Sequence, residues 1–150
     1  MINEKIQELK AMLMAEAGLV EKMVILAMDG LFSSNSSYET EVLTYEKRVN
    51  QIEVDIDSKC ITMIALHQPE ARDLRQILMI YRINNDLERL GDQAVNISES
   101  AAHLISEPIL KALPELPRMA KATLRMLKMS IEAFGREDVE SSRLVCLEDE

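Results

Sequence analysis

The sequence predicts an all-α fold: one three-helix bundle followed by the start of a second, incomplete three-helix bundle. Three observations predict it. The 150 residues are 47% apolar but only 3% aromatic, and ten of them are Met. Turn formers are scarce, with four Gly and four Pro. Apolar residues recur at steps of three or four over long runs, which is the period of an amphipathic helix.

The first helix is predicted from Asn3, a candidate N-cap, to about Gly30. Its apolar stripe repeats with the helical period. The stripe consists of Ile6, Leu9, Leu13, Ala17, Val20, Val24, Ala27 and Leu31. The following "FSSNSS" is typical of a loop because Ser and Asn side chains compete for backbone hydrogen bonds.

The second and third helices are predicted to form a hairpin around Pro69. The second begins at 36–38 and ends at 67–68, because the residue before a proline is pushed out of the helical region. The third begins at Pro69, which suits a first helical turn, and fades at 103–106. Antiparallel packing of these two helices follows from the short connection.

The remaining chain reads as a connection and a partial repeat. "EPILKALPELP" carries three prolines, a fourth helix is predicted from Pro117, and Asp138 is a candidate N-cap for a fifth. Residues 117–150 match 14–47 in layout at an offset of 103 residues. We therefore divide the chain into a first repeat (1–106), a linker (107–116) and a partial second repeat (117–150). We expect the natural protein to be longer by about 70 residues.

Composition and charge exclude several classes of function. The net charge of −9 argues against binding to nucleic acid or acidic lipids. No run of 18 uncharged apolar residues predicts a membrane span, and the charged N-terminus is unlike a signal peptide. A cytoplasmic location is expected. Cys60 and Cys146 both fall in apolar helical patterns and are predicted to be buried free thiols.

Two acidic rows run beside the apolar stripes of the second and third helices. Residues i, i+4, i+7 and i+11 share a helix face. In the second helix the row is Glu46, Asn50, Glu53 and Asp57, and in the third it is Asn85, Glu88, Asp92, Asn96 and Glu99. Each row contains an E-x-x-x-D pair, whose oxygens suit hard cations such as Mg²⁺, Mn²⁺, Ca²⁺ or ferric iron. The competing interpretation is a solvated acidic surface.

Counting from the hairpin turn leaves the two E-x-x-x-D pairs at different heights. At about 1.5 Å per residue the pairs differ by roughly 12 Å. A shared cluster would then need other helices, for example from a second repeat or a second subunit. Gly91, between Glu88 and Asp92, is predicted to let a neighbouring helix approach closely because it lacks a Cβ.

Catalytic motifs are not found in the sequence. No Glu is followed by His at i+3, so the ligand pattern of di-iron bundles is missing. There is no Gly-rich phosphate loop, no Cys-x-x-Cys and no nucleophile motif. The protein is therefore not expected to be an enzyme.

Residues 49–97 carry several motifs in order: V-N-x-x-E-x-x-x-D, then Q-P and D-L-R, then L-E-R-L-G-D followed by Asn. In this combination the chain resembles the PhoU family. The resemblance implies two similar three-helix bundles and a non-enzymatic, cytoplasmic regulator of phosphate uptake. Such a protein is expected to damp the phosphate-starvation response as an adaptor between the ATPase subunit of a phosphate ABC transporter and a sensor histidine kinase. It also implies homodimers and metal clusters on the E-x-x-x-D motifs.

Carried over by position, the expected metal ligands are the two E-x-x-x-D pairs and two neighbours on the second helix. These candidates are Glu53, Asp57, Glu88 and Asp92, with Asn50 and Glu46 beside them. The metal is left open among iron, zinc, manganese and magnesium. The alternative function is a metal-storage or purely structural helical module with solvated acidic faces.

Overall fold

The computed structural model is all-α, as predicted, and describes every residue except 34, 36, 105–112 and 150. Every regular element in these described residues is a helix. The helices are α1 (Ile2–Ser33), α2 (Ser37–His67), α3 (Ala71–Leu104), α4 (Glu115–Arg136) and α5 (Val139–Glu148). In the part of the chain that the structure describes, no helix is long and apolar enough to cross a membrane.

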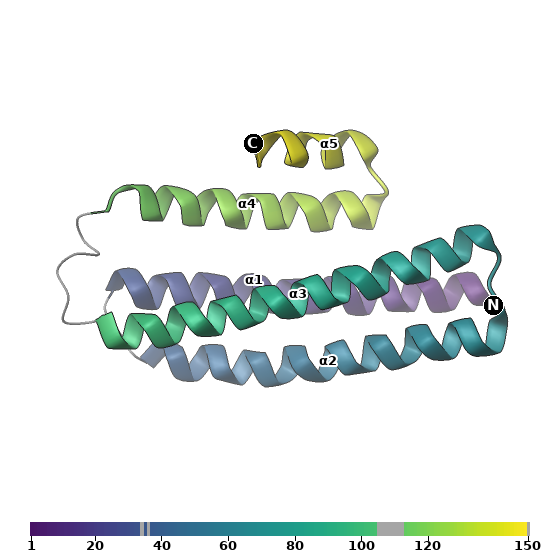
Figure 1. Ribbon diagram of the computed structural model, residues 1–150, viewed down its shortest axis with the longest axis horizontal. Helices are drawn as coiled ribbons and strands as arrows, with labels where there is room; N and C mark the ends of the chain where they lie inside the picture. Colours follow the sequence, from purple (N-terminus) through teal and green to yellow (C-terminus); the bar gives the residue numbers. More distant parts are fainter. Residues whose placement is uncertain (34, 36, 105–112, 150) are drawn as a thin grey trace.

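Helices α1, α2 and α3 form an up-down-up bundle in which α1 and α3 run in the same direction (Figure 1). The hairpin between α2 and α3 lies where Pro69 predicts it. Helix α2 ends at His67, and Gln68 takes a positive φ of 42° that ends the helix. Pro69 and Glu70 precede the first residue of α3, Ala71.

The core of this bundle is built from aliphatic side chains at helical spacing, as the stripes predict. The largest fully buried apolar side chains are Ile6, Leu9, Leu13, Val20, Met23, Val42, Val49, Ile56, Ile77, Ile80 and Leu87. They come from all three helices. Two polar side chains, Glu16 and Asn84, are as deeply buried as these and belong to the site described below.

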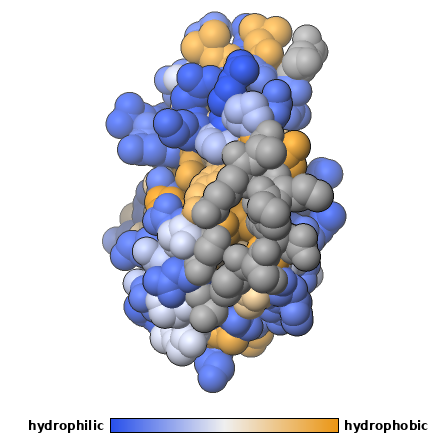
Figure 2. All heavy atoms as spheres, turned by 90° about the vertical axis from the view of Figure 1, so that its left-hand side faces the viewer, coloured by the Kyte–Doolittle hydropathy of each residue, from blue (hydrophilic) through white to orange (hydrophobic). Residues whose placement is uncertain are grey.

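Helix α4 lies along α1 outside the three-helix bundle, and α5 folds back on α4 (Figure 1). The inner face of α4 packs against the core through four partly buried side chains, Leu124, Leu127, Ile131 and Phe134. Figure 2 shows the end of the molecule where α3 ends and α4 begins, with apolar surface between the hydrophilic surfaces of the bundle and of the outer helices. Ala120 and Ala133 are the buried residues of α4, whereas the described residues of α5 include none.

The turn between α4 and α5 is fixed by local capping and by one ion pair to α1. Glu137 has a positive φ of 56°, and the Asp138 side chain accepts from Ser141 N, so the predicted N-cap is confirmed. The buried Lys10 donates from Nζ to Glu137 Oε1 at 2.6 Å. This pair connects the first bundle to the turn that begins α5.

Three details differ from the sequence predictions. Helix α1 begins at Ile2, so Asn3 lies inside it and is not its N-cap. Helix α4 begins at Glu115, inside the predicted linker, whose residues 107–112 lie outside the described chain. Cys60 is buried as predicted, but Cys146 is exposed, because α5 has few neighbours to cover it. Both thiols are free within the described structure.

Candidate functional site

The six predicted site residues lie on helices α2 and α3. Four of them come from α2 and two from α3. Glu46, Glu53, Asp57 and Glu88 are half-buried, whereas Asn50 and Asp92 are exposed. The acidic rows therefore border the core, as their position beside the apolar stripes predicts.

Asn84 links the two helices inside this region. Its Nδ2 donates to the Glu53 backbone carbonyl at 3.1 Å and to Asp57 Oδ1 at 2.9 Å. Asn84 is fully buried on α3, one turn before Glu88. The side chain thus brings the E-x-x-x-D segment of α2 against the segment of α3 that carries Glu88.

Glu53 and Glu88 interact within a single bundle. Burial raises the pKa of Glu88, and the neighbouring carboxylates of Asp92 and Glu53 raise it further. Burial likewise raises the pKa of Glu53, with an additional contribution from Asp57. The charge of Glu53 thus reaches Glu88 across the two helices. The expectation that a shared metal cluster needs other helices stays a prediction.

A further carboxyl group, which the sequence analysis missed, lies beneath this cluster. Glu16 on α1 has 0% of its surface exposed. Neither of its carboxyl oxygens has a hydrogen-bond partner among the residues that the structure describes. Burial, followed by the charges of Glu53, Asp57 and Glu88, raises the pKa of Glu16 to about 8. The acidic cluster therefore draws on all three helices of the bundle.

The helix register places Glu16 and Asn84 at one height. Gly91 of α3 faces Met23 of α1, since a Cβ on Gly91 would lie 3.6 Å from the Met23 methyl. Seven residues before Met23 is Glu16, and seven residues before Gly91 is Asn84. Because α1 and α3 run in the same direction, both residues lie two turns, about 10.5 Å, below that contact.

A signal for Glu16 and Asn84 was present in the sequence. Glu16 follows Leu13 by three residues and precedes Val20 by four, so it occupies a core position of α1. Asn84 likewise follows Ile80 by four residues and precedes Leu87 by three. An acid or amide at such a position is either paired in the core or part of a site.

The donor atoms of this cluster suit a hard cation, but their positions do not form a ready-made metal site. Carboxylate and amide oxygens are the ligands that Mg²⁺, Mn²⁺ and Ca²⁺ prefer. Within the described residues, however, no group of three or more His, Cys, Asp or Glu side chains is placed so that it could hold a metal ion. Binding by these carboxylates would require some of them to rotate.

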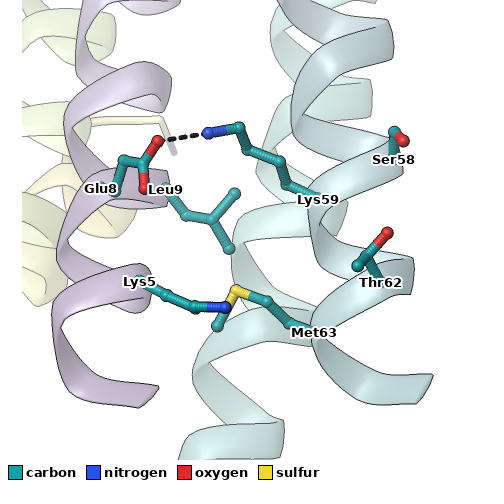
Figure 3. A pocket seen from close by; sticks show the side chains of 7 residues that line it. All are labelled: Lys5, Glu8, Leu9, Ser58, Lys59, Thr62 and Met63. Atoms are coloured by element: carbon teal, nitrogen blue, oxygen red, sulfur yellow. Dashed lines mark hydrogen bonds and ion pairs between the residues drawn. The ribbon is translucent and has the colours of Figure 1, made fainter. Parts of the chain in front are cut away.

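Two surface clefts in the described part of the chain are built without the predicted metal ligands. One, of about 190 Å³, is bordered by Lys5, Glu8 and Leu9 of α1 and by Ser58, Lys59, Thr62 and Met63 of α2. Figure 3 shows it with the ion pair between Lys59 and Glu8 across the two helices. Another, of about 450 Å³, lies between α3, α4 and α5 and is lined mainly by aliphatic side chains. Neither includes a residue of the predicted metal site.

Comparison with known proteins identifies the family. The family model described as "PhoU domain" matches residues 13–101, which include α2 and most of α1 and α3. The chain belongs to the PhoU family. The matched residues include Glu16, the acidic residues of α2 and α3, and Asn84.

Several PhoU proteins are similar over almost the whole of this chain. It is 37% identical over 147 residues to the phosphate-specific transport system accessory protein PhoU homolog of Aquifex aeolicus, covering 98% of this chain and 66% of that protein. It is 31% identical to Escherichia coli PhoU over 98% of this chain and 61% of that protein. The crystal structure of PhoU from Pseudomonas aeruginosa matches with a TM-score of 0.88 at 31% identity, over 94% of this chain and 68% of that one. The chain thus spans about two thirds of the length of these relatives.

Proposed function

We propose that this protein is a non-enzymatic accessory of a phosphate-specific transport system. In this role it acts in the cytoplasm as an adaptor, often as a homodimer, between the transporter's ATPase subunit and a sensor histidine kinase. It damps the phosphate-starvation response when phosphate is plentiful. The observation that carries the proposal is membership of the PhoU family, together with relatives named as accessory proteins of phosphate-specific transport.

The proposal includes a cation bound by the acidic faces of α2 and α3. Glu53, Asp57, Glu88 and Asp92 are the main candidates, with Asn50 and Glu46 beside them. The raised pKa values of Glu53 and Glu88 support it, because burial and, after it, neighbouring carboxylates both disfavour the uncompensated negative charge. A bound cation would neutralise this charge. Its identity stays open among iron, zinc, manganese and magnesium.

The second candidate function is a metal-storage or structural module with solvated acidic faces. The exposed positions of Asn50 and Asp92 favour it. The half-burial of Glu53, Asp57 and Glu88 argues against a purely solvated face, because burying carboxylates is costly. These two candidates differ in what they predict for binding partners and for cation affinity.

The adaptor role is tested by co-purification. The full-length protein is expected to recover the transporter's ATPase subunit and the kinase from cells grown in high phosphate. Recovery of neither partner would reject the adaptor and leave the storage or structural candidate. Repeating the capture with Glu88→Gln/Asp92→Asn shows whether the acidic face contributes to docking.

The cation is tested by titrating Fe³⁺, Mn²⁺, Mg²⁺ and Zn²⁺ into the protein and into Glu88→Gln/Asp92→Asn. Loss of two carboxylates is expected to weaken binding at least about tenfold. The matched control is Glu41→Gln/Asp55→Asn, which removes two exposed acids from α2 and the same amount of charge. Equal weakening in both variants would indicate nonspecific attraction to a negatively charged protein.

A further inference from the structure

Helix α4 carries a basic stripe, although the chain as a whole has a net charge of −9. The members of the stripe recur at helical spacing, so they share one face of the helix. Glu132 interrupts the stripe near its end, and the uninterrupted part runs from Arg118 to Lys128. The stripe consists of five exposed residues, Arg118, Lys121, Arg125, Lys128 and Arg136.

The basic stripe points away from the three-helix bundle. Helix α4 packs on the core through its other side, which carries Leu127 and Ile131. Arg125 pairs with Glu148 of α5. Within the described residues, the other members of the stripe make no ion pair. Most of this positive charge is therefore available to another molecule.

The acidic rows of α2 and α3 form a surface of opposite charge and similar length. Their carboxylates make no ion pair within the described residues. Burial, followed by neighbouring carboxylates, raises the pKa of Glu88, so a positively charged partner is favoured there. On α2 the row runs from Glu46 to Asp57, and on α4 the uninterrupted stripe runs from Arg118 to Lys128. At about 1.5 Å per residue these lengths are roughly 16 and 15 Å.

One chain does not bring these two surfaces together. Helix α4 packs mainly on α1 and α5. Figure 1 shows α2 and α4 on opposite sides of α1 and α3. A second copy of the chain offers the acidic rows to the basic stripe of the first. Two copies that use both surfaces reciprocally close a dimer, because a twofold axis repeats each contact.

We propose that two copies of this chain associate through α4, with the basic stripe of each copy placed on the acidic rows of α2 and α3 in the other. The inference rests on the proposed function in one respect, that the protein forms homodimers, and it names the surfaces that form the dimer. Complementary charges fix the partner and the register of such an interface. At 0.1 M salt the repulsion between the two acidic chains is screened beyond about 10 Å, whereas charges in contact are screened much less.

The deciding experiment reverses the charge of each surface and measures molecular mass by sedimentation equilibrium. Lys121 and Lys128 are seven residues apart on α4, and Asp92 and Glu99 are seven apart on α3. All four side chains are exposed, so their reversal leaves the core unchanged. The parent is expected to be a dimer. Lys121→Glu/Lys128→Glu and Asp92→Lys/Glu99→Lys should each raise the Kd of dimerisation at least about a hundredfold, because like charges then face each other.

Mixing the two variants separates a specific contact from damage to the fold. In an equimolar mixture each interface again joins opposite charges, so a heterodimer with the affinity of the parent is expected. A mixture that stays monomeric would overturn the inference. The matched control is Lys5→Glu/Arg143→Glu, which makes the same change in net charge as the α4 variant at exposed positions of α1 and α5. It should dimerise like the parent, and equal weakening in the control would reduce the effect to net charge and reject the proposed contact.

The failures of the two proposals are distinguishable. If the parent is a dimer and neither reversal weakens it, the homodimer stands and the surfaces named for it are wrong. If the parent stays monomeric up to its solubility limit, both the homodimer and these surfaces are rejected. A monomeric parent whose capture of the transporter's ATPase subunit is lost in Lys121→Glu/Lys128→Glu would assign the stripe to an acidic partner and overturn the inference. The adaptor role is judged separately by recovery of that subunit and the kinase.

Discussion

Two layers of the same bundle, two helical turns apart, are filled by side chains of opposite character, apolar in one and polar in the other. In the upper layer Met23, Val49 and Gly91 meet, and a Cβ on Gly91 would lie 3.6–3.8 Å from the other two side chains. In the lower layer the corresponding positions of the three helices are Glu16, Ile56 and Asn84, all fully buried. The upper layer is apolar and the lower one carries a carboxyl group and an amide.

The difference teaches that burial alone does not make the lower layer stable. In the upper layer each contact stabilises the fold, because apolar side chains make no hydrogen bonds to water that burial would break. The lower layer removes a carboxyl group from water without giving it a partner in the described residues. Such a group is kept neutral by its raised pKa or must be compensated by a bound ion. The buried carboxyl group of the lower layer therefore lowers the free energy of unfolding.

The largest expected effect comes from removing the lower layer's carboxyl group. The pKa of Glu16 is raised from 4.5 to about 8, so the folded protein holds a proton that the unfolded chain releases above pH 4.5. At pH below 4.5 both states are protonated and Glu16 costs nothing through ionisation. Stability then falls as pH rises, by about 1.4 kcal/mol per unit and about 3 kcal/mol by pH 7, and levels off above pH 8.

Glu16→Leu should abolish this slope. Urea unfolding at pH 5, 6 and 7, in buffers with a chelator, is expected to show the variant gaining stability over the parent as pH rises. Glu21→Leu serves as the matched control, since Glu21 lies on the α4 side of the same helix. A constant difference between Glu16→Leu and the parent across this pH range would contradict the raised pKa.

The next effect comes from overfilling the upper layer. Gly91→Leu places a full side chain where Met23 and Val49 leave room only for a Cβ. Overpacking a well-filled core typically costs about 1–3 kcal/mol. The change is measured as a lower urea midpoint at pH 7. Unchanged stability would show that the Gly91 contact is looser than the distances indicate.

The smallest expected effect is a gain in stability from adding one methyl group to the upper layer at Gly91. A Cβ at Gly91 would meet Met23 and Val49 at ordinary contact distances, and Gly91 lies inside α3 without a positive φ. Gly91→Ala should therefore raise the unfolding free energy by about 0.5–1 kcal/mol, because Ala is the better helix former. Gly18→Ala, where a Cβ would meet no heavy atom within 4 Å among the described residues, gives a comparison without a core contact. A loss of stability in Gly91→Ala alone would mean that even one methyl group does not fit.

The apolar part of the bundle could be predicted from the sequence because each stripe follows the helical period and Pro69 marks the hairpin. Asp138 likewise predicted the start of α5, since its side chain caps the helix that it precedes. These features are local, and the residues concerned lie within a few positions of one another. The PhoU motifs on α2 and α3 are local too, and the family they indicate is confirmed.

The inner part of the site could not be predicted by following apolar residues. In α3 the buried row runs through Asn84 and Gly91, whereas the neighbouring apolar residues Ile83 and Leu90 are only half-buried. The stripe in α1 took Ala17 and passed over Glu16, although both are buried. Which of two adjacent residues faces a partner depends on how the helices rotate against each other, and one helix alone does not contain that information.

The Lys10–Glu137 pair has a consequence for the order of folding. It joins residues 127 positions apart, whereas the contacts within the α2–α3 hairpin close short loops. Such a distant contact is entropically expensive until α1 is held in its bundle, since α1 then presents Lys10 in a fixed place. Helices α4 and α5, with few buried residues of their own, are therefore expected to dock on a bundle that has already formed and to release from it first. The core of the protein would keep its amide hydrogens while the outer two helices exchange theirs.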